Sequence, residues 1–342
     1  SLCIMIYVCV YTGFDIPWFS IYVTKTAEDL TELKSQVENM PYAAQAFVPG
    51  HVTGIFRIHD GANDPLLRGS VGAGFCISIG TKTTVRLADS AISKASVEYN
   101  GSPIEAPVTE MVIQRLLHQY KRVCEVEVAH ESMLPIGVGF GASGAGALGA
   151  SLALSALLDS NSTLQDAAAH AHYAEVVNHT GLGDVIAQTV GGVEVRIKPG
   201  APGIGETIDV PFPEKLHVVL AGAPGLETRS ILTNSTHRER IIKAGDELMK
   251  NLIETHTFSA FVSSSKKFAE AIDLMTPRIR KALENLGNAG LNDSSMVMLG
   301  DSVFCFCTAS EIKDAVSILS EYWQESQIVK TSVYEDGGGL VK

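Results

Sequence analysis

The stretch that most constrains this chain runs from Leu134 to Ser151, where a proline and alternating glycines lead into a run of alanine, leucine and serine. Glycine lets backbone N–H groups turn toward a ligand without a Cβ in the way. The Ala/Leu run, which reaches Leu158, predicts a buried helix. A glycine-rich turn at a helix N-terminus offers free N–H donors and the positive end of the helix dipole. This stretch is therefore predicted to cradle a phosphate group.

Two other interpretations of the glycines compete with this one among nucleotide-binding motifs. A P-loop is excluded, because no Gly-Lys-Ser/Thr follows. The dinucleotide pattern G-x-G-x-x-G begins at Gly139, and Asp159 lies at a suitable distance. That motif must follow a strand directly, whereas residues 129–135 separate the strand-like residues 123–128 from the glycines. The dinucleotide interpretation is therefore disfavoured, and a plain helix-packing turn stays open.

Composition narrows the class of protein. A chain of 342 residues is long enough for about two domains with a sizeable core. Its formal net charge of −12 argues against nucleic-acid or anionic-membrane partners, because both require basic surfaces. The six cysteines form no C-x-x-C pair and no zinc-ligand spacing. We therefore expect a cytoplasmic protein with reduced thiols and no nucleic-acid or membrane partner; a homodimer is left open.

Changes in composition divide the chain into segments. Residues 1–39 contain an apolar run too short for a membrane helix, and they lack the basic region and cleavage site of a signal peptide. We expect them to be a non-native or disordered extension, with Met40 as the true start. The other expected segments are an N-terminal lobe at 40–198, a glycine- and proline-rich linker at 199–213, a C-terminal lobe at 214–336 and a mobile tail at 337–342.

Local patterns predict strands on either side of the glycines. We expect a strand, a turn and a strand over residues 46–58, and paired strands 75–79 and 81–87 about Gly80. Another hairpin is expected around Asn100-Gly101, a dipeptide typical of tight turns. The C-terminal lobe is predicted to have the order βαββαβ, as in a ferredoxin-like unit.

Three motifs together resemble those of the GHMP kinases, and among them the archaeal pantoate kinases. Pro135-x-Gly137-x-Gly139-Phe140-Gly141-Ala142-Ser143-Gly144-Ala145 resembles their phosphate-binding motif, although Ala142 replaces its first serine and Gly144 its first alanine. Gly181-Leu182-Gly183-Asp184 resembles their S-G-x-D segment. Pro49-Gly50-His51-Val52-Thr53-Gly54, followed by Asp64-Pro65-Leu66-Leu67-Arg68-Gly69-Ser70-Val71-Gly72-Ala73-Gly74, resembles the opening motifs of the pantoate kinases. The last glycine-rich motif of the superfamily is matched only by residues 289–295.

This resemblance implies an α+β, two-lobe fold, with an N-terminal α/β lobe that carries the phosphate-binding loop and a ferredoxin-like C-terminal lobe. It implies an ATP:pantoate 4-phosphotransferase of coenzyme A biosynthesis, with ATP and Mg²⁺ as cofactors. Asp184 would take the proton of the acceptor hydroxyl or orient it, and Ser143 and Glu175 would hold Mg²⁺. The residues expected to bind ATP are Pro135, Gly137, Gly139, Gly141, Ala142, Ser143, Gly144 and Ala145.

The expected acceptor site combines the resemblance with the chemistry of pantoate, a small hydroxy acid. Arg68 would clamp its carboxylate with two parallel hydrogen bonds. Thr53 and His51 would bind hydroxyls, and His51 would also act catalytically as a donor in place of the lysine usual in the superfamily. The loop residues Ser70, Gly72, Ala73 and Gly74 would complete the substrate site. A kinase for shikimate or homoserine, or a non-catalytic metabolite sensor of the same fold, remains as an alternative.

Overall fold

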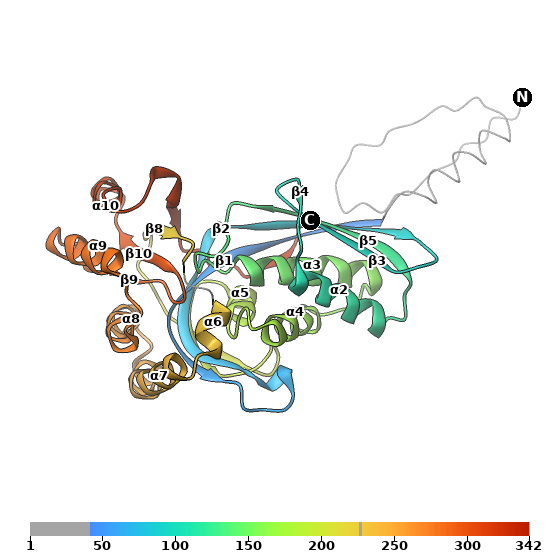
Figure 1. The fold of residues 1–342 in the computed structure, drawn as a ribbon, viewed down its shortest axis with the longest axis horizontal. Coiled ribbons are helices and arrows are strands. Elements are labelled where there is room, and N and C mark those ends of the chain that lie inside the picture. The colour runs from blue at the N-terminus through green and yellow to red at the C-terminus, as the bar shows by residue number, and fades with distance from the viewer. Residues whose placement is uncertain (1–41, 226–227, 342) are drawn as a thin grey trace, which may run out of the picture.

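The N-terminal lobe is built on a long, bent sheet (Figure 1). The computed structural model describes residues 42–225 and 228–341. Within them the strand order is β12-β1-β2-β5-β3-β4, with β6 beside β2 and β7 beside β6. Only β3 and β5 pair in parallel in this described sheet. The strands are β1 (Tyr42–His59), β2 (Gly69–Asp89), β3 (Lys94–Tyr99), β4 (Ser102–Pro103), β5 (Cys124–Ser132), β6 (Val193–Lys198), β7 (Glu206–Asp209) and β12 (Gly339–Leu340).

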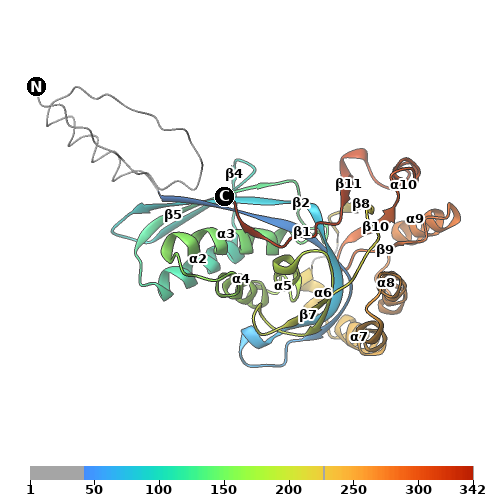
Figure 2. The same ribbon diagram turned by 180° about the vertical axis from the view of Figure 1, so that it is seen from behind.

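Helices cover one face of this sheet, with α3 packed directly on β1 and β2 and flanked by α2 and α4 (Figures 1 and 2). Every residue of α3 from Gly144 to Ser155 is buried, as its Ala/Leu composition predicts for a helix that is apolar all round. The helices of this lobe are the short 3₁₀ helix η1 (Pro65–Leu67), α2 (Pro107–Gln119), α3 (Ala142–Leu158), α4 (Leu164–Asn178) and α5 (Asp184–Val190). A Thr163/Asp166 capping box begins α4.

The C-terminal lobe has the predicted ferredoxin-like order. Its four strands pair antiparallel in the order β11-β8-β10-β9. The strands are β8 (His217–Ala223), β9 (Ser294–Met296), β10 (Asp301–Cys307) and β11 (Ile328–Ser332). The helices are α6 (Thr228–Thr233), α7 (Ser235–Thr255), α8 (Phe258–Ile272), α9 (Pro277–Asn288), α10 (Ile312–Leu319) and the 3₁₀ helix η2 (Glu325–Gln327). Phe75 of β2 packs against Phe261, Phe304 and Phe306, so aromatic rings join the two lobes.

Two of the predicted hairpins are wrong. β1 and β2 are continuous strands of 18 and 21 residues that pair antiparallel over most of their length, with a register shift at Pro49/Gly50. A Cβ on Gly50 would come within 2.6 Å of Leu134, and one on Gly80 within 2.3 Å of the Val48 carbonyl oxygen. These glycines serve close packing inside strands, where glycine is also typical. The Asn100-Gly101 hairpin is present, and both residues have positive φ.

The chain returns to the N-terminal lobe after β11, in a segment that we call the C-terminal strap (residues 333–341). β12 pairs with β1, and the Gly338 N–H donates to the Gln188 carbonyl oxygen at 2.7 Å. The prediction of a mobile glycine tail is therefore wrong for the described part of 337–342. The predicted linker contains β7, which pairs with β6 and so belongs to the N-terminal sheet.

The expected extension over residues 1–39 lies outside the described residues. In the part of the chain that the structure describes, no helix is both long and apolar enough to cross a membrane. Cys305 and Cys307 lie buried on β10, where they act as small core side chains.

Candidate active site

The predicted phosphate cradle has a left-handed backbone at every second residue. Gly137, Gly139 and Gly141 have φ values of 77°, 84° and 73°, which side chains with a Cβ rarely adopt. The N-cap of α3 is Gly141, which has no side chain to accept hydrogen bonds from the first turn. The first N–H groups of this helix therefore remain for a ligand. Successive turns of this kind aim N–H groups at one point and favour an anion there.

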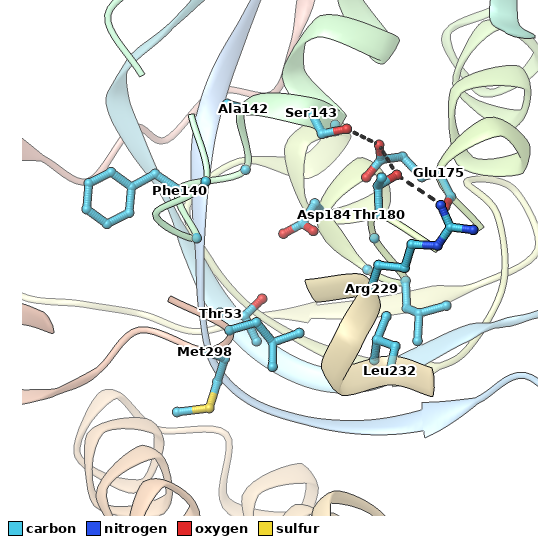
Figure 3. A pocket seen from close by; sticks show the side chains of 18 of the residues that line it. Thr53, Phe140, Ala142, Ser143, Glu175, Thr180, Asp184, Arg229, Leu232 and Met298 are labelled. Atoms are coloured by element: carbon cyan, nitrogen blue, oxygen red, sulfur yellow. Dashed lines mark hydrogen bonds between the residues drawn. The ribbon is translucent and has the colours of Figure 1, made fainter. Parts of the chain in front are cut away.

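The cradle forms one wall of a cavity of about 760 Å³ between the lobes (Figure 3). Of the predicted site residues, those that line it are Thr53, Ser70, Pro135, Gly137, Gly139, Gly141, Ala142, Ser143, Gly144, Glu175 and Asp184. The C-terminal lobe contributes Met298, whose N–H donates to the Thr53 carbonyl oxygen at 2.9 Å. A Cβ on Gly300 would lie 2.3 Å from the Val138 carbonyl oxygen. This 298–300 turn, and not the predicted segment 289–295, packs against the cradle.

Ser143, Glu175 and Thr180 form a hydrogen-bonded group beside the cradle (Figure 3). Both hydroxyls donate to Glu175 Oε1, at 2.5 Å from Ser143 and 2.8 Å from Thr180. Burial raises the pKa of Glu175 to about 7, against the two hydrogen bonds, which lower it. Its other oxygen, Oε2, is buried and has no partner among the described residues. A buried carboxylate oxygen without a partner, next to a hydroxyl, fits a hard cation such as Mg²⁺.

The described residues contain no group of three or more His, Cys, Asp or Glu side chains arranged to hold a metal. An ion at Glu175 would therefore take most of its ligands from water and from phosphate oxygens. That is the usual binding mode of Mg²⁺ in phosphoryl-transfer enzymes, which hold it through one or two carboxylates plus the substrate.

Asp184 is the first residue of α5, and its side chain lines the cavity (Figure 3). Its Oδ1 lies 2.8 Å from His51 Nδ1, and His51 Nε2 lies 3.3 Å from Glu194 Oε1. Glu194 in turn forms a buried ion pair with Arg196. Burial raises the pKa of Asp184, but the hydrogen bond and charge of His51 and the charge of Arg196 outweigh it, and the pKa lies below its usual value. Asp184 is therefore an ionised acceptor at neutral pH.

The structure does not place His51 in the cavity. Its side chain is fully buried between Asp184 and Glu194. Burial lowers the pKa of His51, but the two carboxylates raise it by more. The predicted contacts of His51 with substrate hydroxyls and the transferring phosphoryl group therefore do not agree with its position. His51 instead contacts the Asp184 carboxylate from the buried side, through Nδ1.

The predicted substrate-binding loop at Ser70–Gly74 is not a loop, because these residues belong to β2 and are paired with β1. Gly72 pairs with Arg196 of β6, and Gly74 with Glu194. A Cβ on Gly72 would lie 2.6 Å from Arg196 Nη2, and one on Gly74 would lie 2.5 Å from His51 Nε2. Gly72 and Gly74 make room for the buried charged side chains, and Ala73 is part of the core. Ala145 is likewise buried in α3.

Arg68 also lies outside the main cavity, against the prediction that it clamps a carboxylate there. Its Nε donates to the Ala62 carbonyl oxygen at 2.6 Å and its Nη2 to that of Asn63 at 3.2 Å. The side chain lines a smaller pocket of about 280 Å³ with Asp60 and Arg238. These contacts brace the turn that leads into β2.

Sequence reasoning missed three polar residues of the cavity, Thr180, Arg196 and Arg229. Arg196 is buried, and its Nε has no partner among the described residues. A signal for it existed, because Glu194 and Arg196 alternate with valines in Val193–Lys198. Charges within an otherwise apolar strand must be paired or functional, since an isolated buried charge is costly. Arg229 carries no such pattern.

Known proteins agree with this geometry. A family model described as GHMP kinases N terminal domain matches residues 107–192, which include the cradle, Glu175 and Asp184. The two-lobe fold and the cradle thus define the class as GHMP kinase. The chain belongs to the pantoate kinase family: it is 35% identical over 283 residues to the pantoate kinase of Thermococcus kodakarensis, covering 81% of this chain and 92% of the relative. It is 32% identical over 277 residues to that of Methanocaldococcus jannaschii, covering 80% and 96%.

Solved structures show the same relationship. A protein described as a phosphotransferase related to the CoA biosynthesis pathway aligns with a TM-score of 0.79 and 32% identity. The alignment covers 88% of this chain and 99% of the other. A homoserine kinase from Cytophaga hutchinsonii aligns with a TM-score of 0.65 over 87% of this chain and 97% of its own. At 15% identity the latter likeness concerns the fold alone.

Proposed function

We propose that the chain transfers the γ-phosphoryl group of ATP to the primary hydroxyl of (R)-pantoate, giving 4-phosphopantoate and ADP for coenzyme A synthesis. The observation that carries this proposal is one cavity in which a phosphate cradle, a Ser143/Glu175 pair and an ionised Asp184 face each other. Membership of the pantoate kinase family supports the choice of acceptor.

The residues divide the work as phosphoryl transfer requires. The cradle holds the phosphates, and Ser143 and Glu175 would hold Mg²⁺, which would offset the negative charge of the phosphates. Asp184 orients the acceptor hydroxyl and takes its proton as the new P–O bond forms. A low-pKa base is adequate, because the hydroxyl becomes strongly acidic only late in a loose transition state. His51, held between two carboxylates, keeps Asp184 in place.

For the carboxylate of pantoate, we propose Arg196 in place of Arg68. Arg196 lines the cavity close to Asp184, and its Nε is a buried donor without a partner in the described residues. A substrate carboxylate would accept a hydrogen bond from this Nε. Ser70 Oγ lies near Arg196 Nε, because a Cβ on Gly183 would come within 2.7 Å of both atoms. Phe56 and Leu232, also in the cavity wall, offer the apolar surface that a gem-dimethyl group needs.

The test is ADP release with a panel of acceptors: (R)-pantoate, shikimate, homoserine and no acceptor. We expect pantoate-dependent release that requires Mg²⁺, with the other acceptors near the blank. Turnover of shikimate or homoserine without turnover of pantoate would keep the kinase and reject the acceptor. ATP binding without turnover of any acceptor would favour a metabolite sensor.

A further inference from the structure

Gln188 connects the catalytic helix to the phosphate cradle through a single side chain. It lies one helical turn after Asp184 on α5 and is fully buried. Its Nε2 donates to the Pro49 carbonyl oxygen at 2.9 Å and to that of Gly141, the N-cap of α3, at 3.0 Å. Because both partners are carbonyl oxygens, they determine which amide atom is the nitrogen. The side chain therefore joins α5, β1 and the start of the cradle helix.

Gly144, where the chain departs from the superfamily motif, lies against the other side of the same amide. A Cβ at this position would come within 2.7 Å of Gln188 Oε1 and 3.2 Å of Asp184 Cβ. The amide cannot turn away from such an atom without breaking both of its hydrogen bonds. The first turn of α3 and the helix α5 thus approach each other as closely as glycine allows.

The C-terminal end of α5 is fixed as well. The Gly338 N–H of the C-terminal strap donates to the Gln188 carbonyl oxygen at 2.7 Å. A Cβ on Gly337 would lie 2.1 Å from the Thr189 carbonyl oxygen. The seven residues of α5 pack against β1, α3 and α4, and these two attachments hold its C-terminal end.

We propose that Gln188 is a positioning residue that keeps Asp184 in register with the phosphate cradle, and that Gly144 is the partner this arrangement requires. The inference rests on the proposed role of Asp184 as the group that orients and deprotonates the acceptor. Displacing such a group by about 1 Å costs on the order of a hundredfold in rate. The replacement of the motif's alanine by Gly144 is then explained by the side chain it faces.

The first test measures kcat and KM for three single variants, with thermal unfolding as the check on folding. Gln188→Met keeps the length of the side chain but removes both donated bonds, and we expect kcat to fall about ten- to a hundredfold with KM for ATP changed less than about threefold. Gly144→Ala should lower kcat by about tenfold. Gly146→Ala is the matched control: its Cβ would meet His130 at 3.5 Å, an ordinary contact, and we expect wild-type kcat.

The second test combines variants, because residues that act through one another give non-additive losses whereas independent sites give multiplicative ones. Adding Gly144→Ala to Gln188→Ala should cost less than about threefold, since the atom that it would strike is gone. Adding Gln188→Met to Asp184→Asn should also cost less than about threefold, because there is no base left to position. Multiplicative losses in either pair, or wild-type kcat in Gly144→Ala, would overturn the proposal.

These outcomes can be separated from failure of the proposed function. Unchanged turnover in Asp184→Asn alone, or no turnover of pantoate by the wild type, contradicts the proposed function. In the latter case the same pairs are measured with whichever acceptor the panel identifies. Additivity between Gln188 and Asp184 in an enzyme that does depend on Asp184 contradicts only the positioning role.

Discussion

The two sides of the active-site cavity are built in opposite ways. The proposed phosphate side is a continuous segment, Pro135–Ala145, whose candidate binding groups are backbone N–H donors at the start of α3. The proposed acceptor side is assembled from side chains on separate elements: Thr53 on β1, Ser70 on β2, Asp184 on α5 and Arg196 on β6. A continuous backbone motif can be recognised in a sequence, whereas an assembled side depends on strand register.

The register of β2 against β6 illustrates the difference. Gly72 and Gly74 resemble an anion-binding loop in sequence, but each is paired with a charged residue of β6. Gly72 leaves space for Arg196, which comes more than a hundred residues later in the chain, and Gly74 leaves space for His51 of β1. The sequence pattern therefore indicates where space is needed, and not which group fills it.

The largest expected effect lies on the acceptor side. Asp184→Asn should leave ATP affinity nearly unchanged and lower kcat by about 10² or more, the usual scale for loss of a general base. ATP affinity is measured by equilibrium binding and kcat by ADP release. A kcat within a few-fold of wild type would remove Asp184 from the chemistry and leave the acceptor side without its principal residue.

Arg196→Lys should follow in size. A lysine keeps the positive charge that Glu194 requires but cannot reproduce the planar guanidinium, so kcat/KM for pantoate should fall about ten- to a hundredfold. Arg68→Met is the matched control and should stay within about twofold, because the Arg68 side chain is engaged with the carbonyls of its own turn.

Pantoyl alcohol, which lacks the carboxylate, separates the two arginines further. The loss caused by Arg196→Lys should be much smaller with this substrate than with pantoate. Equal losses on the two substrates would show that Arg196 does not contact the carboxylate, and a selective loss in Arg68→Met would restore the interpretation based on sequence alone.

On the phosphate side, two left-handed glycines can be compared. Alanine at Gly141 or Gly137 carries a similar conformational penalty, about 1–2 kcal/mol. A Cβ at Gly141 would also lie 2.9 Å from the backbone nitrogen of His51, whereas the atom nearest to a Cβ at Gly137 is 3.9 Å away. Gly141→Ala should therefore raise KM for ATP about ten- to thirtyfold, and Gly137→Ala by less. The reverse order would mean that the crowded turn does not shape the phosphate site.

The smallest effect concerns pH. With a pKa of about 7, Glu175 is mostly protonated at pH 6 and mostly ionised at pH 8, so Mg²⁺ affinity in the ATP complex should be about tenfold weaker at pH 6 than at pH 8. Glu175→Gln should abolish this dependence in a magnesium titration of activity and of ATP binding. Persistence of the dependence in the variant would assign it to another group.

The same pKa shift has a consequence for stability without metal. Because the folded state binds the Glu175 proton more tightly than the unfolded state, its contribution to stability falls as pH rises from about 4.5 to about 7. In the metal-free protein, the melting temperature of Glu175→Gln should therefore rise relative to that of the wild type as the pH increases over this range. Added Mg²⁺ and ATP should reduce the gain.

Much of the fold followed from local patterns, and most errors arose where glycine has two uses. The Ala/Leu run predicted buried α3, and the alternating strands predicted the ferredoxin-like lobe, because these signals depend on neighbours in sequence. A glycine within an apolar segment predicts a turn, but Gly50 and Gly80 relieve crowding inside long strands. The position of Arg68 in a glycine-rich segment predicts a substrate clamp, but its side chain is bonded to its own turn. Only the pairing of β2 with β6 brings Arg196 to the cavity.

The C-terminal strap determines when the catalytic geometry can be completed during protein synthesis. Residues up to 198 include the cradle, Asp184 and Gln188, yet Gly338, which fixes the end of α5, is made only after the whole C-terminal lobe. At about 5–20 residues per second, a ribosome needs on the order of 10 s to reach it. An emerging N-terminal lobe therefore lacks the last attachment of its catalytic helix throughout that interval. The proposed active-site groups come mainly from the first lobe, but the end of α5 is bonded to a segment that follows the second lobe in the chain.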